Sequence, residues 1–258
     1  MALQELSLRT DFQQLWQGQD PFAAAAALQG EIFRALEQRQ TLAFDVGQKR
    51  FFIKRHHGVT WKEILKNLVQ LRLPVVSAKN EFRAITKLQA LGIKVPVIAA
   101  YGKKGLLPAN MESFLVTEDV GLHQSLEDYC RTWRTQPPAF AHKRALLEQI
   151  AGIGRTMHTA GVCHRDFYIC HFLFTSENQP LTVIDLHRAL IKRKLAERWV
   201  IKDIAGLYFS ALDAGLTRRD LYRFMQAYRG CALRETLVRD AQFWQAVEKR
   251  ALRLYHEQ

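Results

Sequence analysis

The sequence is poor in cysteine, and the cysteines that it has form no recognisable metal or disulfide pattern. The four residues Cys130, Cys163, Cys170 and Cys231 include no CxxC pair and no metal-ligand spacing. We therefore expect reduced thiols in a cytosolic compartment. Because a buried free cysteine behaves as a small hydrophobic residue, we interpret Cys163 and Cys170 as packing residues.

Long apolar runs are also missing. No segment reaches the roughly 18 consecutive apolar residues that a membrane span requires, and PFAAAAALQG is too short. The N-terminus lacks the basic start and apolar run of a signal peptide, so we expect a soluble or peripheral protein. The sequence also contains no internal repeat, low-complexity linker or heptad array.

Acidic residues are in deficit, with 25 against 37 basic residues and a formal net charge of +12. Such a balance favours contact with an acidic partner: nucleic acid, anionic lipid, a phosphorylated glycan or an acidic protein. Nucleic acid is the least favoured of these, because no nucleic-acid-binding module is recognisable. An apolar content of 48% in 258 residues can bury a core in one large domain or in two lobes around a cleft.

The first 120 residues have the pattern of a small β-rich lobe with one helix. Residues 41–55 alternate in polarity around a turn at Gly47, which predicts a hairpin with Lys54 near the end of its second strand. Apolar residues at helical spacing predict a helix over about 78–91, with Glu81 in its first turn. The segments VPVIAAYG and ESFLVTEDV are typical of strands.

Residues 121–258 have helical periodicity instead, and we place the hinge near 118–122. A helix is predicted over 141–159, where apolar residues recur at spacings of three and four. Thr217 and Asp220 are typical of a capping box that opens a later helix.

Two acidic residues are the main candidates for catalysis and metal binding. Asp166 lies in the run HRDFYICHFLF at 164–174, and Asp185 follows nineteen residues later in LTVIDLH. The pattern predicts a loop, two short apolar strands and a carboxylate. In kinase-type phosphotransferases the first acid accepts the proton of the attacking hydroxyl and the second holds the metal on the nucleotide phosphates.

Each of these residues has an ordinary structural interpretation: a surface cation, a helix-dipole partner or a turn residue. Their order in the chain favours a functional interpretation over these structural ones. Lys54 on a strand, Glu81 on a helix and then Asp166 and Asp185 follow the order of the protein-kinase-like machinery.

The sequence resembles the lipopolysaccharide core heptose kinases that phosphorylate the first heptose of the inner core. The resemblance runs from about Leu15 to Gly230 and is carried by the segments LQGEIFR, FFIKRHHG, SLEDYC, HRDFYICHFL, VIDLHRA and DIAGLYFS. It implies a bilobal, protein-kinase-like α+β fold, with ATP and Mg²⁺ as cofactors. It also implies a lipopolysaccharide core acceptor on the cytoplasmic side of the inner membrane of a Gram-negative bacterium.

The resemblance assigns roles residue by residue. Asp166 is the catalytic base, Asp185 the metal ligand, and Lys54 contacts the α- and β-phosphates while Glu81 holds it. Backbone groups of Asp119 and Val120 would meet the adenine, and Thr117 would lie at the back of that pocket. Asp203, in DIAGLYFS, would brace the catalytic loop.

Three positions depart from the general kinase pattern. His171 stands five residues after Asp166, where kinases have a metal-binding Asn, and imidazole is a poorer ligand for Mg²⁺ than an amide oxygen. Leu186-His187 replaces the Phe-Gly that usually follows the metal-binding Asp. No GxGxxG precedes the hairpin, and Gly30 alone stands in the region of a phosphate-cradling loop.

The acceptor side is strongly basic. Six cations lie in the fifteen residues 188–202 that follow Asp185: Arg188, Lys192, Arg193, Lys194, Arg198 and Lys202. They would attract an anionic glycolipid or a small acidic protein partner. The amphipathic stretch 61–73 either packs under the hairpin or contacts the membrane surface. Two alternatives stay open: a protein kinase, and a non-catalytic kinase-like module that binds an acidic glycolipid or protein.

Overall fold

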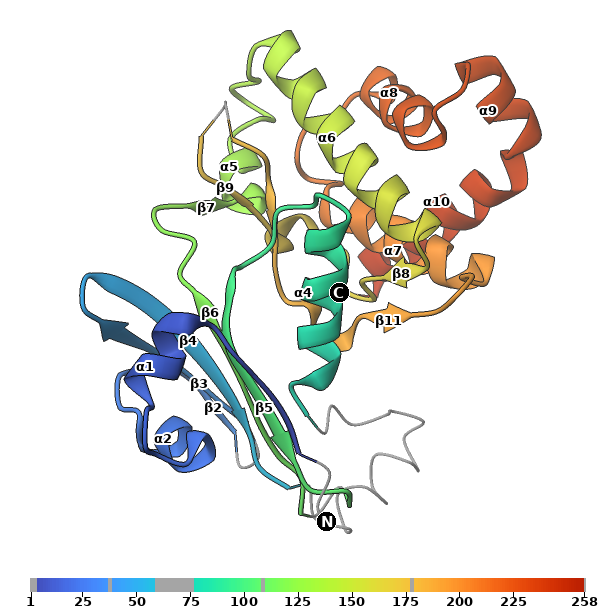
Figure 1. Cartoon of the computed structure of the whole chain (residues 1–258). Helices are drawn as coiled ribbons and strands as arrows, with labels where there is room; N and C mark the ends of the chain where they lie inside the picture. The colour runs from blue at the N-terminus through green and yellow to red at the C-terminus, as the bar shows by residue number, and fades with distance from the viewer. Residues whose placement is uncertain (1–3, 37–38, 59–76, 108–109, 177–178, 258) are drawn as a thin grey trace. The chain divides into compact units, whose positions relative to one another are not determined.

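The computed structural model describes residues 4–36, 39–58, 77–107, 110–176 and 179–257. The contacts between residues divide the chain into two units (Figure 1). The first unit is Met1–Thr86 with Pro96–Gly121, and the second is Lys87–Val95 with Leu122–Gln258. Residues 87–95, which include the last turn of a helix that begins in the first unit, thus belong by their contacts to the second unit.

A six-stranded antiparallel sheet organises the first unit, in the strand order β1-β5-β6-β4-β3-β2. Its strands are β1 (Glu5–Leu8), β2 (Glu31–Leu36), β3 (Arg39–Val46), β4 (Lys49–His56), β5 (Ile98–Lys104) and β6 (Glu112–Glu118). The predicted hairpin is confirmed as β3 and β4, and its turn contains Gly47 at a φ of +61°, where glycine meets no steric penalty.

Two short helices that the sequence did not predict cover one face of this sheet. They are α1 (Thr10–Leu15) and α2 (Pro21–Ala27), and the side chain of Asp20 caps the second helix. Phe12 packs edge-on against Phe51, and Phe22 packs edge-on against Phe114, at centroid distances of 5.1 and 5.3 Å. The core of the first unit therefore lies between α1, α2 and this face of the sheet.

The predicted helix after residue 77 is confirmed as α4 (Lys79–Ala90). Gly92 follows it at a φ of +75°, as expected for a residue that ends a helix. Phe82 of α4 stacks on Tyr101 of β5 at 4.0 Å, which holds the first turns of the helix against the sheet. Glu81 is thereby fixed in position in that first turn.

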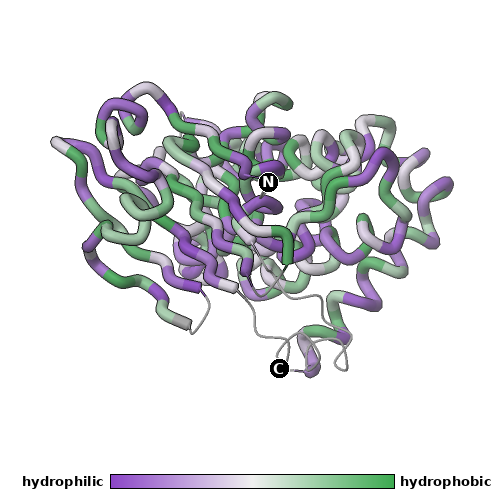
Figure 2. The backbone as a smooth tube through the Cα atoms, turned by 60° about the horizontal axis from the view of Figure 1, so that its bottom comes forward, coloured by the Kyte–Doolittle hydropathy of each residue, from purple (hydrophilic) through white to green (hydrophobic). Residues whose placement is uncertain are grey.

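The second unit is mainly helical. Its helices are α5 (Leu126–Cys130), α6 (Phe140–Thr159), α7 (Glu197–Ser210), α8 (Arg218–Arg229), α9 (Leu233–Arg239) and α10 (Ala241–His256). The helix predicted over 141–159 is confirmed as α6, and the predicted capping box of Thr217 and Asp220 opens α8. Figure 2 shows hydrophobic and hydrophilic stretches alternating along the backbone, as expected for elements that each bury one face.

Small strands and turns hold the segment that contains the two acids. They are β7 (Gln124–Ser125), β8 (Val162–Cys163), β9 (Phe172–Phe174), β10 (Thr182–Val183) and β11 (Leu190–Ile191), with the 3-10 turns η2 (Ile169–His171) and η3 (Leu186–Arg188). Strands β9 and β10 pair antiparallel, which confirms the predicted strand–turn–strand pattern. Strand β11 pairs with β8, so that the chain on both sides of this segment is anchored.

Candidate active site

Lys54 and Glu81 form an ion pair in the first unit. The Nζ atom of Lys54 lies 2.5 Å from Oε1 of Glu81, and the side chain of Glu81 is only 5% exposed. The second oxygen, Oε2, is buried without a hydrogen-bond partner among the described residues. A buried carboxylate of this kind fixes the ammonium group of Lys54, as the sequence predicted for a phosphate-binding lysine.

Thr117 shares a sheet face with Lys54. Residues directly opposite each other in an antiparallel pair point to the same face, and Phe52 is opposite Thr117 while Lys54 is opposite Leu115. The other face, with Phe51, belongs to the core against α1 and α2. The structure therefore brings Thr117 and Lys54 together on the face away from that core.

Asp119 and Val120 follow β6 at the end of the first unit. The backbone N–H of Asp119 donates to the backbone oxygen of Arg50 at 2.9 Å, which attaches this segment to β4. The side chain of Asp119 accepts a hydrogen bond from the N–H of Gly121 at 3.1 Å. The side chain is thus turned toward its own loop, and recognition of a base here would depend on backbone groups.

Gly30 lies just before β2, and the structure explains why it is glycine. A Cβ atom at this position would stand 1.9 Å from the backbone oxygen of Ala43 in β3. This close approach of two backbones needs a residue without a side chain. The requirement for glycine at this position arises from strand packing.

An aromatic pair on the same unit was missed by the sequence reasoning. The ring of Phe33 in β2 packs edge-on against Phe52 of β4 at 5.2 Å, and Phe33 is 55% exposed. Phe52 stands two residues before Lys54 and on the same face, so an exposed aromatic ring lies over the face that carries the lysine. The alternation in the hairpin could have identified Phe52, whereas its contact with Phe33 could not be read from sequence.

In the second unit, Asp203 of α7 holds the catalytic loop by its backbone. Its Oδ2 atom accepts the N–H of His164 at 2.6 Å, and its Oδ1 atom accepts the N–H of Arg165 at 2.8 Å. Burial alone would raise the pKa of Asp203, but the hydrogen bond from His158 and the nearby His164 outweigh burial and lower this pKa. The bracing contact predicted for Asp203 is therefore present as a charged, fully buried clamp.

The two hydrogen bonds that Asp203 accepts stabilise a strained backbone. Arg165 has a φ of +73° and Asp185 a φ of +60°, both in the left-handed region that non-glycine residues rarely adopt. Such residues cost about 1–3 kcal/mol each and persist where the surroundings enforce them, often at functional sites. The strain at Arg165, directly before Asp166, and at Asp185 is typical of a functional segment.

Asp166 lies beside a cation that the sequence analysis did not connect with it. Its side chain is 12% exposed, and Nη1 of Arg188 donates to its Oδ1 at 2.8 Å and to its Oδ2 at 3.2 Å. Arg188 belongs to the basic segment after Asp185. The carboxylate of Asp166 is thus held in place by a guanidinium group while both oxygens keep further acceptor capacity.

His171 and Asp185 face each other. The Nδ1 atom of His171 lies 2.7 Å from the backbone oxygen of Asp166, a contact in which the ring nitrogen must be the donor. The other nitrogen, Nε2, lies 3.6 Å from Oδ2 of Asp185, and His187 contacts Oδ1 of the same carboxylate through its Nδ1. In the neutral form of the ring the lone pair is therefore on Nε2, the atom that faces the carboxylate predicted to hold a metal.

These two residues form an incomplete coordination set. Among the described residues no group of three or more His, Cys, Asp or Glu side chains is arranged to hold a metal ion. Mg²⁺ in phosphoryl-transfer sites usually takes one or two carboxylates and completes its shell with waters and phosphate oxygens. One carboxylate with an adjacent lone pair therefore fits a metal that arrives with a nucleotide.

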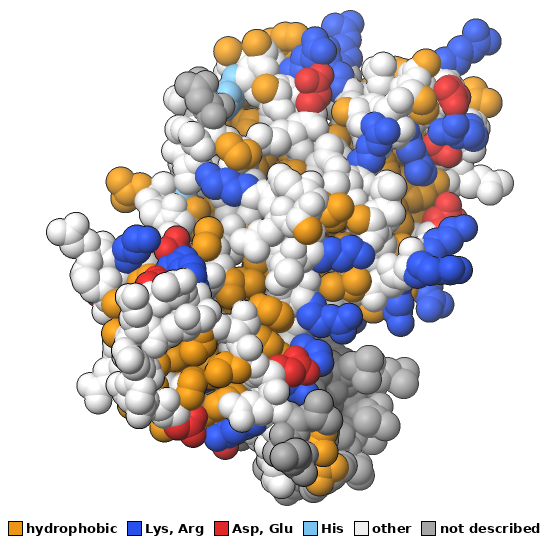
Figure 3. Space-filling model, in the orientation of Figure 1, with side chains coloured by type: hydrophobic (Ala, Val, Ile, Leu, Met, Phe, Trp, Pro, Cys, Tyr) orange, Lys and Arg blue, Asp and Glu red, His pale blue; other side chains and the backbone are white. Residues whose placement is uncertain are grey.

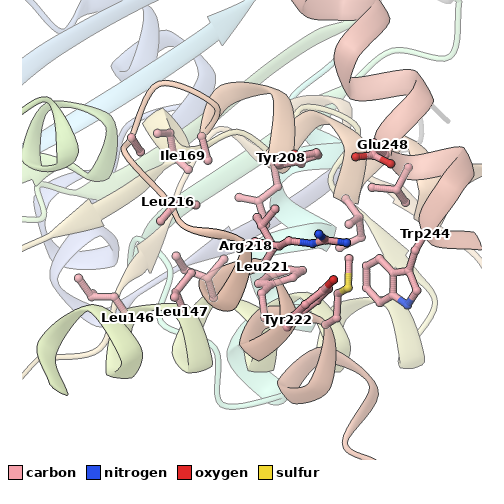
Figure 4. A pocket seen from close by; sticks show the side chains of 18 of the residues that line it. Leu146, Leu147, Ile169, Tyr208, Leu216, Arg218, Leu221, Tyr222, Trp244 and Glu248 are labelled. Carbon is pink, nitrogen blue, oxygen red and sulfur yellow. The ribbon is translucent and has the colours of Figure 1, made fainter. Parts of the chain in front are cut away.

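The second unit also contains a large apolar cavity of about 550 Å³, a size typical of small-molecule sites. Apolar side chains of α6, α7, α8 and α10 form most of its wall. In Figure 4 Leu147 and Leu221 border the cavity, and Arg218 extends its guanidinium toward the side on which Trp244 and Glu248 lie. Sequence periodicity showed only that these helices bury one face, and it gave no sign that the space between them is unfilled.

The four cysteines are buried or partly buried. All four are free, and burial raises the pKa of the Cys130 thiol to about 12 and that of the Cys170 thiol to about 11. A raised pKa keeps a thiol protonated and unreactive at neutral pH. The interpretation of Cys170 as a packing residue is consistent with this.

Lys and Arg side chains outnumber Asp and Glu on the face drawn in Figure 3, most clearly over the helical unit. Among the described residues, no helix has the length and apolar character to cross a membrane. The amphipathic stretch 61–73 lies outside the described residues.

Comparisons with known proteins identify the family of the chain. Residues 23–228 match the lipopolysaccharide kinase (Kdo/WaaP) family. The chain is 47% identical to the lipopolysaccharide core heptose(I) kinase WaaP of Escherichia coli K12 over 90% of each chain. It is 45% identical to the enzyme of the same name from Pseudomonas aeruginosa, over 97% of this chain and 96% of that one.

A solved structure described as WaaP in complex with acyl carrier protein is also similar. The TM-score is 0.84 at 41% sequence identity, and the match covers 97% of this chain and 99% of the other. The fold expected from the sequence, α+β and protein-kinase-like, is confirmed by this match together with the β-sheet first unit and the helical second unit.

Proposed function

The chain belongs to the lipopolysaccharide kinase (Kdo/WaaP) family, and on this premise we propose that it transfers a phosphoryl group from ATP to a hydroxyl of heptose I in the lipopolysaccharide core. It is an ATP-dependent sugar kinase of lipopolysaccharide core biosynthesis. One observation within the chain carries the mechanism. The carboxylate of Asp166 lies on a strained loop, and the buried carboxylate of Asp203 accepts hydrogen bonds from two backbone N–H groups of that loop.

Asp166 acts as the general base. As the acceptor oxygen forms its bond to the γ-phosphorus, the O–H bond breaks and the proton passes to a carboxylate oxygen of Asp166, while ADP leaves with the electrons of the broken P–O bond. Arg188 keeps the carboxylate oriented through Nη1. Positioning of the base and the hydroxyl accounts for much of the rate enhancement, because phosphoryl transfer needs little other covalent work from the protein.

Asp185 and His171 would hold Mg²⁺. The carboxylate of Asp185 supplies the hard oxygen ligand, and the lone pair on Nε2 of His171 stands beside it. When bound, the ion neutralises charge on the phosphate oxygens of the nucleotide. His171 fits a borderline metal better than Mg²⁺, which makes it the weaker member of the pair.

Lys54 would contact the α- and β-phosphates of ATP, held by the ion pair with Glu81. Backbone groups of Asp119 and Val120 would contact the adenine. Thr117, on the same sheet face as Lys54, would close the back of that pocket. The attachment of Asp119 to β4 through Arg50 supports a fixed geometry for these backbone groups.

The enzyme is further proposed to bind a small acidic protein, as the similar WaaP does in its complex with acyl carrier protein. Two observations support such a partner: the net charge of +12 and the apolar cavity, whose chemistry suits an acyl chain. Titration calorimetry with acylated and unacylated acyl carrier protein tests this. Ala211→Phe, which would place a ring in the cavity, should weaken binding of the acylated form alone.

We also propose that the enzyme works in the cytoplasm of a Gram-negative bacterium, where ATP is available, with peripheral contact to the inner membrane that carries the acceptor. Cell fractionation tests this placement. Recovery of the protein solely in the soluble fraction at low and high salt would contradict the membrane contact, because electrostatic attachment to anionic lipid is salt-dependent.

The decisive test of the function compares the wild type with Asp166→Ala. Loss of the base should lower ATP-dependent phosphate incorporation into heptose-containing core oligosaccharide by roughly 10²- to 10⁴-fold. Equal rates for the two proteins would refute the mechanism. Faster transfer to peptide hydroxyls than to oligosaccharide would instead favour a protein kinase. Absence of thermal stabilisation by Mg·ATP would favour a non-catalytic module, because a ligand that binds the native state raises its stability.

A further inference from the structure

The basic segment after Asp185 is divided by the structure into two groups of cations. The run Lys192, Arg193 and Lys194 is exposed to solvent. Arg188 and Lys202 are instead partly buried near the catalytic base, where Arg188 pairs with Asp166. Six cations that look alike in the sequence thus have different surroundings.

Arg165, which lies directly before Asp166 in the sequence, is a third cation close to the catalytic base. Its backbone precedes Asp166, and its guanidinium lies 5.5 Å from the centre of the Trp199 ring on α7. Lys202 stands on the same helix, three residues after Trp199 and thus on the same side of it. The backbone of Arg165 is bound by Asp203, the residue next to Lys202. Arg165 is the neighbour of Asp166 in the chain, Arg188 forms an ion pair with it, and Lys202 is close enough to interact with the charges of all three. We refer to Arg165, Arg188 and Lys202 as the cation cluster.

The cation cluster has too few acidic partners for its charge. Within the described part of the chain, Asp166 is the sole carboxylate that pairs with any of the three, and it pairs with Arg188 alone. Nε of Arg165 is buried without a hydrogen-bond partner there. Burial lowers the pKa of the Lys202 ammonium, and the charges of Arg165 and Arg188 lower it further.

Three cations held together beside one carboxylate leave an excess positive charge in a partly desolvated place. Such an arrangement is unfavourable in the empty protein, and an anion that binds there relieves the repulsion. Arginine in particular recognises carboxylate and phosphate through its planar set of donors. Arg188 uses Nη1 for Asp166, and its other nitrogens make no hydrogen bond to the described residues.

We propose that Arg165, Arg188 and Lys202 form a binding site for an acidic group of the acceptor, a carboxylate or phosphate close to the hydroxyl that Asp166 deprotonates. This inference rests on the proposed function. The site belongs to the acceptor and not to the nucleotide, because Asp185, the metal-binding carboxylate, is flanked by His171 and His187, whereas the cations gather at the base. Binding of the acidic group fixes the position and orientation of the sugar, so that one of its hydroxyl groups reaches Asp166.

Kinetics with Lys202→Gln provide the main test, since Lys202 makes no ion pair with Asp166 and its loss should leave the base in place. The matched control is Lys249→Gln, an exposed cation of α10 outside the basic segment. Deacylated core oligosaccharide is the acceptor, in three forms: intact, enzymatically dephosphorylated, and with its carboxylates reduced to alcohols. Lys202→Gln should raise the KM for the intact acceptor about tenfold, with the KM for ATP unchanged.

The modified acceptors identify the acidic group. On the form that lacks this group, the wild type and Lys202→Gln should have the same KM, since there is no longer an anion to bind. Arg188→Gln should raise the acceptor KM in the same way and also lower kcat, because Arg188 contacts the base. The inference is overturned if the KM ratio of variant to wild type is the same for all three acceptors, or if the KM for ATP rises instead.

A binding measurement separates this inference from the proposed function. Inorganic phosphate, added in the presence of saturating Mg·ADP to fill the nucleotide site, should raise the melting temperature of the wild type and of Lys249→Gln but not of Lys202→Gln. If the wild type fails to phosphorylate the oligosaccharide, the proposed function is wrong, while the phosphate measurement still decides on the site. An equal response of the wild type and Lys202→Gln to phosphate would overturn the site itself.

Discussion

The Nδ1 atom of His171 donates a hydrogen bond to the backbone oxygen of Asp166 at 2.7 Å, and this contact leaves Nε2 as the nitrogen that faces Asp185. One residue thus connects the loop of the base to the carboxylate of the metal site. In the neutral form of the ring the proton is on Nδ1, since a carbonyl oxygen accepts a hydrogen bond but does not donate one.

The first prediction concerns the metal. A borderline nitrogen ligand favours Mn²⁺ over Mg²⁺ relative to an amide oxygen, so the wild type should bind Mn²⁺ in the presence of ADP more tightly than Mg²⁺. His171→Asn should narrow the ratio of the two affinities by about 10-fold. Electron paramagnetic resonance of bound Mn²⁺, with Mg²⁺ as competitor, measures this without turnover. An unchanged ratio would show that His171 does not contact the metal.

The second prediction concerns the nucleotide. Glu81→Gln keeps the shape of the side chain but removes the charge that fixes Lys54, and it should weaken ATP binding about 10-fold. The matched control is Glu31→Gln, which breaks the exposed ion pair with Arg50 in the same sheet and should change little. Titration calorimetry measures both affinities. If the two variants bind ATP equally well, Glu81 has no part in phosphate recognition.

Much of the framework of the site was predictable from the sequence because it depends on local patterns. The hairpin that carries Lys54, the helix that carries Glu81 and the paired strands between Asp166 and Asp185 follow from periodicity and turn residues. The helices α1 and α2 were missed because each is too short to show a clear period.

The contacts that tune the site were not predictable. Arg188 lies 22 residues after Asp166, and nothing in the basic segment distinguishes it from Lys194 until the fold brings one of them to the carboxylate. The contact of Phe33 with Phe52 and the unfilled space among the helices likewise depend on tertiary packing. Such relationships are long-range, so composition and spacing carry no information about them.

The third prediction uses two glycines of one region. Gly161 has a φ of +77°, and a Cβ atom there would stand 1.9 Å from the backbone oxygen of Lys192, so Gly161→Ala should destabilise the fold by about 2–4 kcal/mol. Gly152 lies inside α6 with nothing within 4 Å of an added Cβ. Gly152→Ala should therefore stabilise the fold by about 0.5–1 kcal/mol, because alanine is the better helix former.

Urea denaturation of both glycine variants measures these opposite signs. Loss of stability in Gly152→Ala would mean that α6 is not continuous through this position. A neutral effect of Gly161→Ala would mean that the turn between α6 and β8 adjusts without strain.

The fourth prediction concerns pH. Burial would raise the pKa of Asp220, but hydrogen bonds with Lys143 and Thr217 outweigh it and lower the pKa from 3.8 to about 2. A lowered pKa in the folded state means that the stabilisation is complete above pH 4 and is lost as the pH falls from 4 to 2. Asp220→Asn should remove about 2 kcal/mol of stability at neutral pH and flatten this part of the profile.

Unfolding free energies between pH 2 and 7 test this. Asp213→Asn, which removes an exposed carboxylate of the same unit, serves as the control. A profile for Asp220→Asn that falls between pH 4 and 2 as steeply as that of the wild type would contradict the role of the capping box in acid stability.

Strand β1 has a consequence for the behaviour of the chain in solution. It pairs with β5 along four residues and so occupies what would otherwise be an open border of the sheet. An uncovered strand border displays unpaired N–H and C=O groups that recruit strands of other molecules and start aggregation. Residues 5–8 replace the edge of β5 by an edge strand of only four residues, and short edge strands limit pairing between molecules. The ion pair of Glu5 with Lys79 attaches this short strand to α4, the helix that carries Glu81.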